Sequence, residues 1–416
     1  MPKKERIIVG LDIGTTKICA VVAEATDDET SINVIGVGSS LSRGLRKGVV
    51  VDIESTVESI KEAVEKAELM AAVQINSVYT GIAGSHISSE STHGVVALKK
   101  REVLNGDITR VIETARCGAV IPADRRVLHV LPREFIVDDQ EGIRDPIGIA
   151  GSRLEVDVHI VTGAVTSAQN LVRCVNRAGL DVADIILQPL ASSAAVLSAE
   201  EQELGVVMVD LGGGTSDVAI YVDGSIRHSA VIPIGGNHLT RDLTQVLRTS
   251  HADAERIKVQ HGVSLSEQVD QEESIEVPSV GGRPPRLVPR SYVAEVLEPR
   301  VEEMFELVRR EIRRAGYDGL LVAGGVLTGG TSLLPGMAEA AERILDLPVR
   351  CGGPTGISGL QEKVSSPTCA TGVGLILHAI RHEHGMSRMG VAAVGSGAGI
   401  WSSVLDRMKD RVMSFF

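Results

Sequence analysis

The stretch VVMVDLGGGTSDVAIYV, residues 206–222, decides the fold that we expect for this chain. Its apolar run 206–210 predicts a buried strand ending at Asp210, the glycine-rich turn reverses the chain, and 218–222 predicts a second strand. A turn of Gly, Thr and Ser can point several backbone N–H groups into one hollow, where they hold phosphate oxygens. Glycine is needed because a phosphate approaches more closely than a side chain would allow. The stretch therefore predicts a phosphate-binding β-hairpin.

The same pattern occurs near the start of the chain, in IIVGLDIGTTKICAVVAEA, residues 7–25, with Asp12 in the place of Asp210. After each copy a third apolar run and then a helical pattern follow, so the sequence predicts a duplicated domain half. One Gly-Thr-Thr turn alone fits a plain hairpin equally well, but two such turns favour a phosphate clamp. Neither copy has the pattern of a P-loop, and neither turn opens a helix, which disfavours P-loop and Rossmann sites.

Length and composition restrict the class of protein further. A chain of 416 residues with 43% hydrophobic residues predicts two or more domains in one globular body. Its net charge of -12 argues against a nucleic-acid partner, and its five scattered Cys indicate a reduced cytosol rather than a disulfide framework. The start, MPKKERIIVGLDIG, does not resemble a signal peptide, and no apolar run approaches the ~18 residues of a membrane span. We therefore expect any membrane contact to be peripheral.

Two segments interrupt the duplicated pattern. Residues 86–161 alternate short strands around one helical stretch, DITRVIETARCGA, and predict an inserted α+β subdomain. Residues 237–304 contain the helical stretch DAERIKVQHG and the proline-rich VPSVGGRPPRLVPR, which favours a loop or an edge strand. Near the end, 386–399 is rich in small residues and predicts a flexible linker.

Five motifs occur in the order of one superfamily. The two turns resemble the phosphate loops of actin, DnaK chaperones and sugar kinases; IILQPLASSAAVL and SSPTCATGVGLILHAI resemble its connecting helices, and VLTGGTSLLPGM its adenosine loop. Within it, SRGLRKGVVVDIE, TGIAGSHISS, QEGIRDPIGIAGSRLEVDVHIVTG, VIPIGGNHLTRDL and AERIKVQHG resemble the FtsA family of bacterial cell-division proteins over almost the whole chain.

The resemblance implies an α/β actin-like, ribonuclease-H-like duplicated fold, with two lobes around a nucleotide cleft, an inserted α+β subdomain and a C-terminal amphipathic helix. It divides the chain into subdomain 1A (1–85, continued at 162–189 and 366–385), inserted subdomain 1C (86–161), subdomain 2A (190–236, continued at 305–365), subdomain 2B (237–304), the linker (386–399) and the membrane-targeting helix (400–416).

The resemblance also implies ATP and Mg²⁺ as cofactors. Lys17 and the first loop would face the β- and γ-phosphates, the second loop would close from the other side, and Asp12 and Asp210 would hold Mg²⁺ through water. Gln188 would orient the attacking water, with Asp210 beside it in the catalytic set. The nucleotide-binding residues implied are Asp12, Gly14, Thr15, Thr16, Lys17, Gly212, Gly213, Gly214, Thr215, Glu255, Lys258, Gly329 and Gly330.

Some of these positions have simpler alternatives. Gln188 equally suits a helix cap, because an amide is a poor base and at most orients water. Glu255 and Lys258, which would reach the ribose and adenine, also suit a solvated ion pair on one helix. Asp217 is a secondary site candidate or a turn residue.

The last residues, WSSVLDRMKDRVMSFF, hold the only Trp of the chain. On a helix their apolar side chains form one stripe and their charges fall elsewhere, which is typical of a helix that lies in the surface of a membrane. A terminal helix docked on the protein's own core is the alternative, which the small-residue linker disfavours. The predicted membrane-binding residues are Trp401, Val404, Leu405, Met408, Val412, Phe415 and Phe416.

Together the residues and the resemblance predict an ATP-binding, actin-like protein that polymerises and tethers the FtsZ ring to the cytoplasmic face of the inner membrane at the division septum. The implied partners are the FtsZ C-terminal peptide at 2B, later division proteins at 1C, further copies in a filament, and lipid. Its principal role would be structural, with at most slow Mg-dependent ATP hydrolysis. A small-metabolite kinase and a chaperone ATPase of the same fold are the alternatives.

Overall fold

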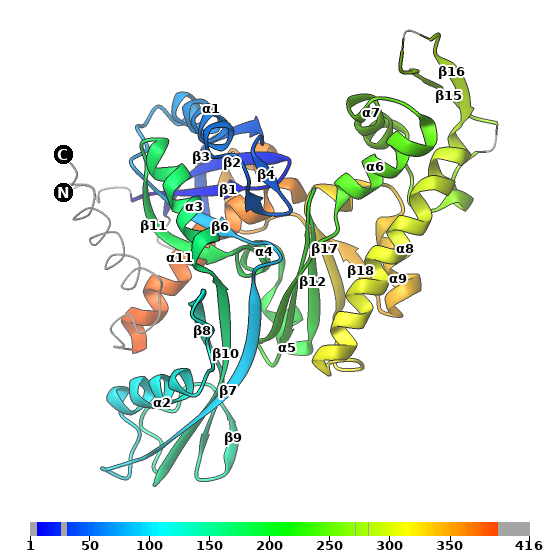
Figure 1. The fold of residues 1–416 in the computed structure, drawn as a ribbon. Helices are drawn as coiled ribbons and strands as arrows, with labels where there is room; N and C mark the ends of the chain where they lie inside the picture. Colours follow the sequence, from blue (N-terminus) through cyan, green and yellow to red (C-terminus); the bar gives the residue numbers. More distant parts are fainter. Residues whose placement is uncertain (1–5, 26–30, 271, 282, 390–416) are drawn as a thin grey trace.

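The computed structural model describes residues 6–25, 31–270, 272–281 and 283–389. It has two α/β lobes side by side and an inserted subdomain that projects below them (Figure 1). The predicted membrane-targeting helix lies outside the described residues. Helix α11 (Ala370–Met389) continues through residues 386–389, so the prediction that the linker begins at 386 is wrong. Met and Arg are good helix formers, and a helix already running gains one hydrogen bond with each added residue.

The first lobe is built on a six-stranded sheet in the order β11-β6-β1-β2-β3-β19. Strands β1 and β2 are antiparallel, with Asp12 opposite Cys19, so the predicted hairpin is confirmed. Strands β6 and β11 extend the sheet in parallel on the far side of β1. The bounds are β1 (Ile7–Ile13), β2 (Lys17–Ala25), β3 (Ile32–Leu41), β6 (Ser77–Ile82), β11 (Asp181–Leu187) and β19 (Ile357–Gly359).

The second lobe repeats this arrangement with a five-stranded sheet in the order β14-β13-β12-β17-β18. An antiparallel meander is again followed by two parallel strands beside its first strand. The predicted duplication is therefore present in three dimensions. The bounds are β12 (Val206–Leu211), β13 (Ser216–Val222), β14 (Ser225–Ile232), β17 (Gly324–Thr328) and β18 (Val349–Cys351).

Helices cover the first sheet and connect the lobes. Helix α1 (Ile53–Ala71) begins at the cap Asp52, which accepts a hydrogen bond from the Ser55 amide, and buries residues at helical spacing. Helices α4 (Gln188–Val196) and α11 touch backbone to backbone, because a Cβ at Gly374 would lie 1.8 Å from the Ala191 carbonyl oxygen. The remaining elements of this half are α3 (Val165–Arg177), α10 (Gln361–Val364), β4 (Leu45–Arg46), β5 (Val49–Val50) and η3 (Pro367–Cys369). Helix α5 (Ala199–Leu204) follows α4 and contacts β13 of the second sheet.

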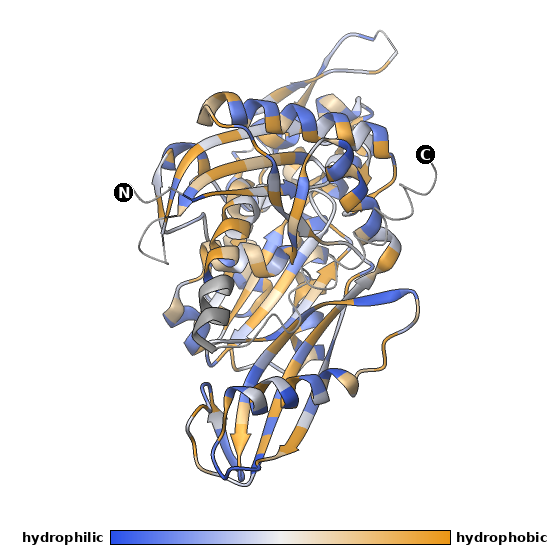
Figure 2. Ribbon diagram, turned by 90° about the vertical axis from the view of Figure 1, so that its left-hand side faces the viewer, coloured by the Kyte–Doolittle hydropathy of each residue, from blue (hydrophilic) through white to orange (hydrophobic). Residues whose placement is uncertain are grey.

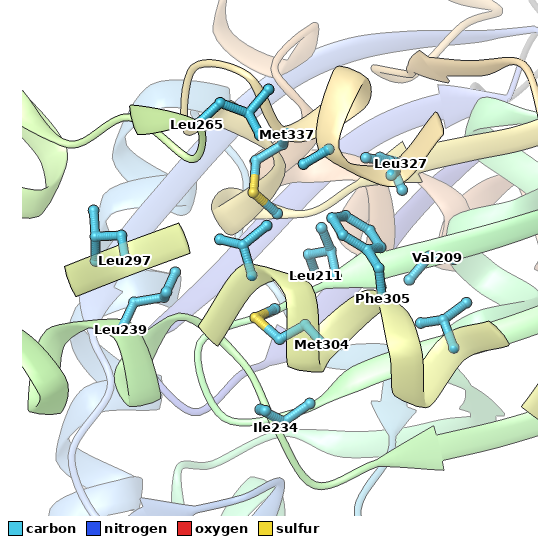
Figure 3. Close-up of a cluster of buried hydrophobic side chains, with 14 of the residues drawn as sticks. Val209, Leu211, Ile234, Leu239, Leu265, Leu297, Met304, Phe305, Leu327 and Met337 are labelled. Carbon is cyan, nitrogen blue, oxygen red and sulfur yellow. The ribbon is translucent and has the colours of Figure 1, made fainter. Parts of the chain in front are cut away.

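Long helix α8 (Arg290–Ala315) packs on the second sheet. Phe305, fully buried, lies at the centre of a cluster with Met304, Val209 and Leu327, so helix and sheet share one core (Figure 3). The proline-rich stretch that we predicted as a loop or edge strand contributes to the hairpin of β15 (Ser274–Val277) and β16 (Arg286–Pro289), which projects from the lobe (Figure 1). The other elements are α6 (Gly236–Leu247), α7 (His251–His261), α9 (Met337–Leu345), η1 (Ser266–Gln268) and η2 (Gly330–Leu333).

The inserted subdomain is a four-stranded antiparallel sheet with one helix on it, as its alternating pattern predicts. Hydrophobic and hydrophilic positions alternate along its strands, and the apolar ones form a core of their own beneath the helix (Figure 2). It contacts the second lobe where the Ser89 hydroxyl donates to the Ser229 carbonyl oxygen at 2.9 Å. The bounds are β7 (Ser88–Ala97), α2 (Asn105–Cys117), β8 (Arg125–Val137), β9 (Gln140–Ile143) and β10 (Arg153–Ala164).

Candidate nucleotide-binding site

A cavity of about 420 Å³ lies between the two lobes, within the range of ligand sites. Its walls come from both hairpin turns, the start of α4, helices α6 and α7, and the loop after β17. All of the predicted nucleotide and catalytic positions lie around it. They are Asp12, Gly14, Thr15, Thr16, Lys17, Gln188, Asp210, Gly212, Gly213, Gly214, Thr215, Glu255, Lys258, Gly329 and Gly330.

The two glycine-rich turns have the same internal geometry. Gly14 donates its backbone N–H to the Lys17 carbonyl oxygen at 3.0 Å, and Gly212 donates in the same way to Thr215 at 3.0 Å. The match follows from the duplication, because each turn closes an equivalent hairpin. It presents two sets of backbone amides to one cavity.

The turns also touch each other across the cleft. A Cβ at Gly213 would lie 2.4 Å from Cγ2 of Thr16, and a Cβ at Gly214 would lie 2.6 Å from Oγ1 of Thr15. Only glycine permits this approach. The first lobe thereby meets the second at the turns that we expect to hold phosphate.

Three carboxylates line the cavity, and of these Asp210 and Asp217 are buried and Asp12 is half-buried. Burial, opposed by the nearby Lys17 ammonium, raises the pKa of Asp12 to about 7. Burial also raises the pKa of Asp210, although hydrogen bonds from Ser192 and Thr371 oppose the rise. Burial and the charges of the other two carboxylates raise the pKa of Asp217 well above its usual value.

This group of carboxylates fits a divalent cation. Asp217 Oδ1 is buried and has no hydrogen-bond partner in the described part of the chain. Buried carboxylates that repel one another are stabilised in their charged form by a cation between them. Among the residues described, no group of three or more His, Cys, Asp or Glu is placed to ligate a metal directly. Asp12 and Asp210 are therefore candidates to hold Mg²⁺ through its water ligands.

The environment of Asp210 includes residues that our sequence analysis missed. Its Oδ2 accepts hydrogen bonds from the Ser192 hydroxyl at 2.6 Å and from the Thr371 hydroxyl at 3.2 Å. Ser192 lies on α4 and Thr371 on α11, the two helices that touch at Gly374. Both hydroxyls occur inside the stretches read as connecting helices, and a small polar residue on an otherwise apolar helix is the signal that would have found them.

Lys17 lines the cavity, and its ammonium donates to the Thr368 carbonyl oxygen at 2.6 Å. This contact joins the first turn to η3, directly before α11. The ammonium is therefore held at the wall of the cavity by a neutral acceptor, which leaves its other hydrogens for an anion.

Gln188 does not use its side chain to cap its helix. The N-cap of α4 is Leu187, and the Gln188 amide instead donates from Nε2 to Asp12 Oδ1 at 3.1 Å. Gly81 allows the amide this position, since a Cβ there would lie 2.8 Å from Cγ of Gln188. The capping alternative is therefore wrong, while a role in orienting water stays a prediction.

Glu255 and Lys258 are paired, with 2.8 Å between Oε2 and Nζ, but the pair is not simply solvated. The Lys258 ammonium is mostly buried and also donates to the Thr240 hydroxyl at 2.9 Å and to the Gly236 carbonyl oxygen at 3.2 Å. It thus joins α7 to the start of α6 at the cavity wall. Val259 and Leu333, which we did not predict, line the same end and are largely exposed.

The loop after β17 fits closely on the second turn. Gly329 has φ of +81° and approaches Asp210 so closely that a Cβ would lie 2.3 Å from Oδ1. The Thr331 hydroxyl donates to the Gly212 carbonyl oxygen at 3.0 Å. This loop therefore forms one wall beside the phosphate turn, where the resemblance places the adenosine.

Comparison with known proteins agrees with this architecture. The family model described as Cell division protein FtsA matches residues 207–374, and the one described as SHS2 domain inserted in FTSA matches 84–162. The cell division protein FtsA of Pseudomonas aeruginosa is 49% identical over 412 residues, which cover 99% of this chain and 98% of that protein. The chain belongs to the FtsA family.

Other FtsA proteins show the same relationship. The protein of Escherichia coli K12 is 45% identical over 91% of both chains, and that of Bacillus subtilis is 40% identical over 90% of this chain and 84% of the relative. The resemblance to FtsA on which the sequence analysis depends is therefore confirmed. The small-metabolite kinase alternative is not favoured.

Comparison with solved structures shows that this chain has an actin-like fold. The PilM-PilN type IV pilus biogenesis complex matches with a TM-score of 0.67 and 16% identity, covering 91% of this chain and 99% of that one. MreB5 of Spiroplasma citri, solved bound to ADP, matches with a TM-score of 0.56 and 14% identity, covering 93% and 99%. The predicted fold class is confirmed. Among the helices that the structure describes, none combines the length and apolar character needed to cross a bilayer.

Proposed function

We propose that this FtsA-family protein binds ATP and Mg²⁺ between its lobes, polymerises, and tethers the FtsZ ring to the cytoplasmic face of the inner membrane at the division septum. It thereby recruits later division proteins. The observation that supports this proposal is the full-length match to cell division proteins named FtsA together with one cavity that collects both phosphate turns. The polymer and its membrane attachment, rather than rapid catalysis, are the principal activity.

The nucleotide would bind with its phosphates between the two turns. Backbone amides of residues 14–16 and 212–215 would hold phosphate oxygens, and the Lys17 ammonium would add positive charge. Asp12 and Asp210 would hold the waters of Mg²⁺. When bound, Mg²⁺ neutralises phosphate charge. Because the turns come from different lobes, the nucleotide would fix the lobes relative to each other in the form that joins a filament.

Hydrolysis would be slow. Gln188 would orient the attacking water with its amide oxygen, while its Nε2 donates to Asp12. An amide accepts no proton at neutral pH and only positions water. The bound triphosphate therefore persists long enough to support a polymer.

Attachment to the membrane would use the apolar stripe of residues 400–416, which lie outside the described residues. Apolar burial would supply most of the binding, because the basic residues of the tail barely exceed its acidic ones. One such helix binds reversibly, and a filament that presents many tails binds firmly. Polymerisation and membrane binding would thus support each other.

Subdomain 2B and the inserted subdomain would bind the protein partners. Residues 237–304 would bind the C-terminal peptide of FtsZ, and the inserted subdomain, 86–161, would bind later division proteins. The inserted subdomain has its own apolar core and projects from the body, so it can present a surface without disturbing the cleft (Figure 1). Each partner therefore has a separate site.

Liposome flotation would test the proposal. The intact chain and one ending at Met389, the end of α11, are mixed with liposomes of anionic lipid, with and without ATP and Mg²⁺, and FtsZ is then added. We expect the intact chain to float, to float more completely with ATP, and to carry FtsZ with it, whereas the shortened chain stays in solution. Equal flotation of the two chains, or FtsZ left behind by the bound protein, would contradict the proposal.

A further inference from the structure

The inserted subdomain contacts the lobe to which it is not joined. The chain enters it from β6 and leaves it into α3, and both of these elements belong to the first lobe. Its strands β7, β8 and β10 nevertheless contact β14, the strand at the end of the second sheet. The inserted subdomain, which lies beneath both lobes in Figure 1, therefore bridges them.

Hydrogen bonds join two strands of the inserted sheet to Ser229 on β14. Nε2 of His159 is hydrogen-bonded to the Ser229 hydroxyl at 2.9 Å, and the Ser229 carbonyl oxygen accepts from the Ser89 hydroxyl. His159 lies on β10 and Ser89 on β7. A single residue of the second lobe thus holds both strands.

A second group of contacts links β8 to β14. The Ser225 hydroxyl donates to the Arg133 carbonyl oxygen at 2.9 Å, and the Arg133 guanidinium donates to the Arg227 carbonyl oxygen. The Arg227 guanidinium in turn donates to Oε1 of Glu134 at 3.1 Å. The two strands therefore bond to each other in both directions.

An ion pair extends this contact beyond β9. Arg144 donates to Oε1 of Glu203 at 2.6 Å and to the Asp223 carbonyl oxygen at 3.0 Å. We call the contacts of five residues of the inserted subdomain with the second lobe the brace contact. These residues are Ser89, Arg133, Glu134, Arg144 and His159.

The brace contact is polar. The apolar core of the inserted subdomain is formed by its own residues, and apolar packing with the second lobe occurs at its base, where Val161 and Ile226 belong to one cluster. Docking also buries Nε of Arg133, which has no hydrogen-bond partner in the described part of the chain. Water can replace hydrogen bonds and ion pairs of this kind and can satisfy this Nε. The contact can therefore open while the subdomain stays folded.

Both ends of the brace lead to a phosphate turn. Strand β14 pairs with β13, with Ile232 opposite Ser216, directly after the second turn. In the first lobe, β6 leads into the inserted subdomain and pairs with β1, which ends at the first turn. A rotation of one lobe that separates the turns therefore shifts β14 against the inserted subdomain. In this structure the turns touch and the brace contact is made.

The geometry points to a regulatory role: the inserted subdomain is a releasable brace that stabilises the arrangement of the lobes in which the two phosphate turns meet. Release of the brace contact favours separated turns, and a ligand that holds the turns together favours the brace contact. The effect on nucleotide binding rests on the proposed function, whereas the effect on the turns themselves does not.

Hydrogen–deuterium exchange of the full chain, followed by mass spectrometry, measures both ends of the brace. The variant Arg144→Glu with Glu134→Lys places like charges beside Glu203 and Arg227 and leaves the net charge unchanged. Without nucleotide, this brace variant should exchange about threefold faster or more at β14 and at both phosphate turns, as expected when partly exposed ion pairs are lost.

A matched control makes the same changes of charge inside the inserted subdomain. Arg153→Glu with Glu155→Lys exchanges the members of an ion pair whose charged atoms lie 2.8 Å apart. This control should exchange as the unaltered chain does at β14 and at the turns. Ser225→Ala removes one hydrogen bond of the brace contact without a change of charge, and it decides if the brace variant does not fold.

Fluorescence titration with ATP and Mg²⁺ provides a second measurement. The brace variant should bind ATP about threefold more weakly or worse than the control, because a smaller fraction of the protein has its turns together. By the same coupling, ATP should slow exchange at β14 in the unaltered chain.

The inference stands if the brace variant exchanges faster at both β14 and the turns while the control does not. It is overturned if β14 alone exchanges faster, if neither region does, or if the control behaves as the brace variant does. In a chain that binds ATP, unchanged affinity in the brace variant also overturns it. If the unaltered chain does not bind ATP, the proposed function fails, and exchange at the turns still decides whether the brace exists.

Discussion

The side-chain amide of Gln188 is hydrogen-bonded from Nε2 to Oδ1 of Asp12, at 3.1 Å. The two residues lie 176 positions apart, at the start of α4 and near the end of β1. The bond holds the carboxylate that would face Mg²⁺ and leaves the amide oxygen of Gln188 free to accept from a water. One residue can therefore position both the carboxylate and the attacking water.

Gln188→Ala should slow hydrolysis of bound ATP by about tenfold or more, because the attacking water loses its acceptor. The measurement is single-turnover hydrolysis with protein in excess. Gln361→Ala, an exposed position on α10, is the control and should hydrolyse ATP at the unaltered rate. An unchanged rate in Gln188→Ala would remove Gln188 from the hydrolytic step.

Asp210→Ala should weaken Mg-dependent ATP binding by at least about tenfold, or about 1.4 kcal/mol. The variant removes a carboxylate that Ser192 and Thr371 hold toward the cavity. Fluorescence titration with and without Mg²⁺ measures the effect, which should vanish without the metal. Asp318→Ala, at an exposed carboxylate in the turn after α8, should bind as the unaltered chain does. Retained affinity in Asp210→Ala would exclude Asp210 from the site.

The duplicated sheets could be predicted from the sequence because each strand and turn is defined by a short continuous stretch of residues. Each strand is an apolar run, each turn is rich in glycine, and the two copies share their order, so Asp12 and Asp210 could be aligned without a structure. The positions of the two glycine-rich turns were predicted from the same pattern, and their binding of phosphate stays a prediction. The prediction of a linker from residue 386 was wrong, since composition alone does not show where a helix that has already formed ends.

The contacts that complete the site could not be predicted because they join distant parts of the chain. Ser192 and Thr371 meet at Asp210 only because α4 and α11 touch backbone to backbone at Gly374. Lys17 likewise reaches the Thr368 carbonyl oxygen, which lies 351 positions away along the chain. No periodic sequence pattern shows which hydroxyl or carbonyl groups will contact the site, because those contacts depend on how the helices pack.

Phe305→Ala should lower the free energy of unfolding by about 3–5 kcal/mol, because it removes a fully buried ring from the core shared by α8 and the second sheet. Chemical denaturation followed by circular dichroism measures the loss. Tyr292→Ala removes an aromatic ring from the same helix at a site that is 41% exposed, and it should cost far less. If the two variants lost the same free energy of unfolding, this core would not be what determines the stability of the protein.

His159 should make stability depend on pH. It is buried between the inserted subdomain and β14, where Nε2 bonds to the Ser229 hydroxyl at 2.9 Å and Arg133 donates to Nδ1 at 3.2 Å. Burial, with the nearby Arg133, His228 and His129, lowers its pKa to about 3. Below the pKa of the unfolded state the unfolded chain gains a proton that the native chain does not, so acid favours unfolding.

The free energy of unfolding should therefore fall by about 1.4 kcal/mol between about pH 7.5 and about pH 5.5 through this group alone. Urea denaturation at the two pH values measures it. His159→Gln keeps hydrogen-bonding groups but does not titrate, and its pH dependence should be smaller by that amount. An identical pH dependence in both proteins would show that His159 titrates normally.

Exchange of Trp401 and Phe415 for Glu should release the protein from liposomes of anionic lipid. Both residues belong to the apolar stripe predicted for 400–416, and burying a carboxylate in the boundary of the membrane costs more free energy than one short helix gains there. The same two exchanges should leave ATP affinity unchanged, because the nucleotide cavity is formed by residues 12–371.

Exchange of Ser402 and Ser403 for Glu adds the same charge on the polar side of the predicted helix and serves as the control. If the control floats and the first variant does not, position on the stripe rather than added charge decides binding. Unaltered flotation of Trp401→Glu with Phe415→Glu would instead show that the stripe packs on protein, and the membrane tether would have to lie elsewhere.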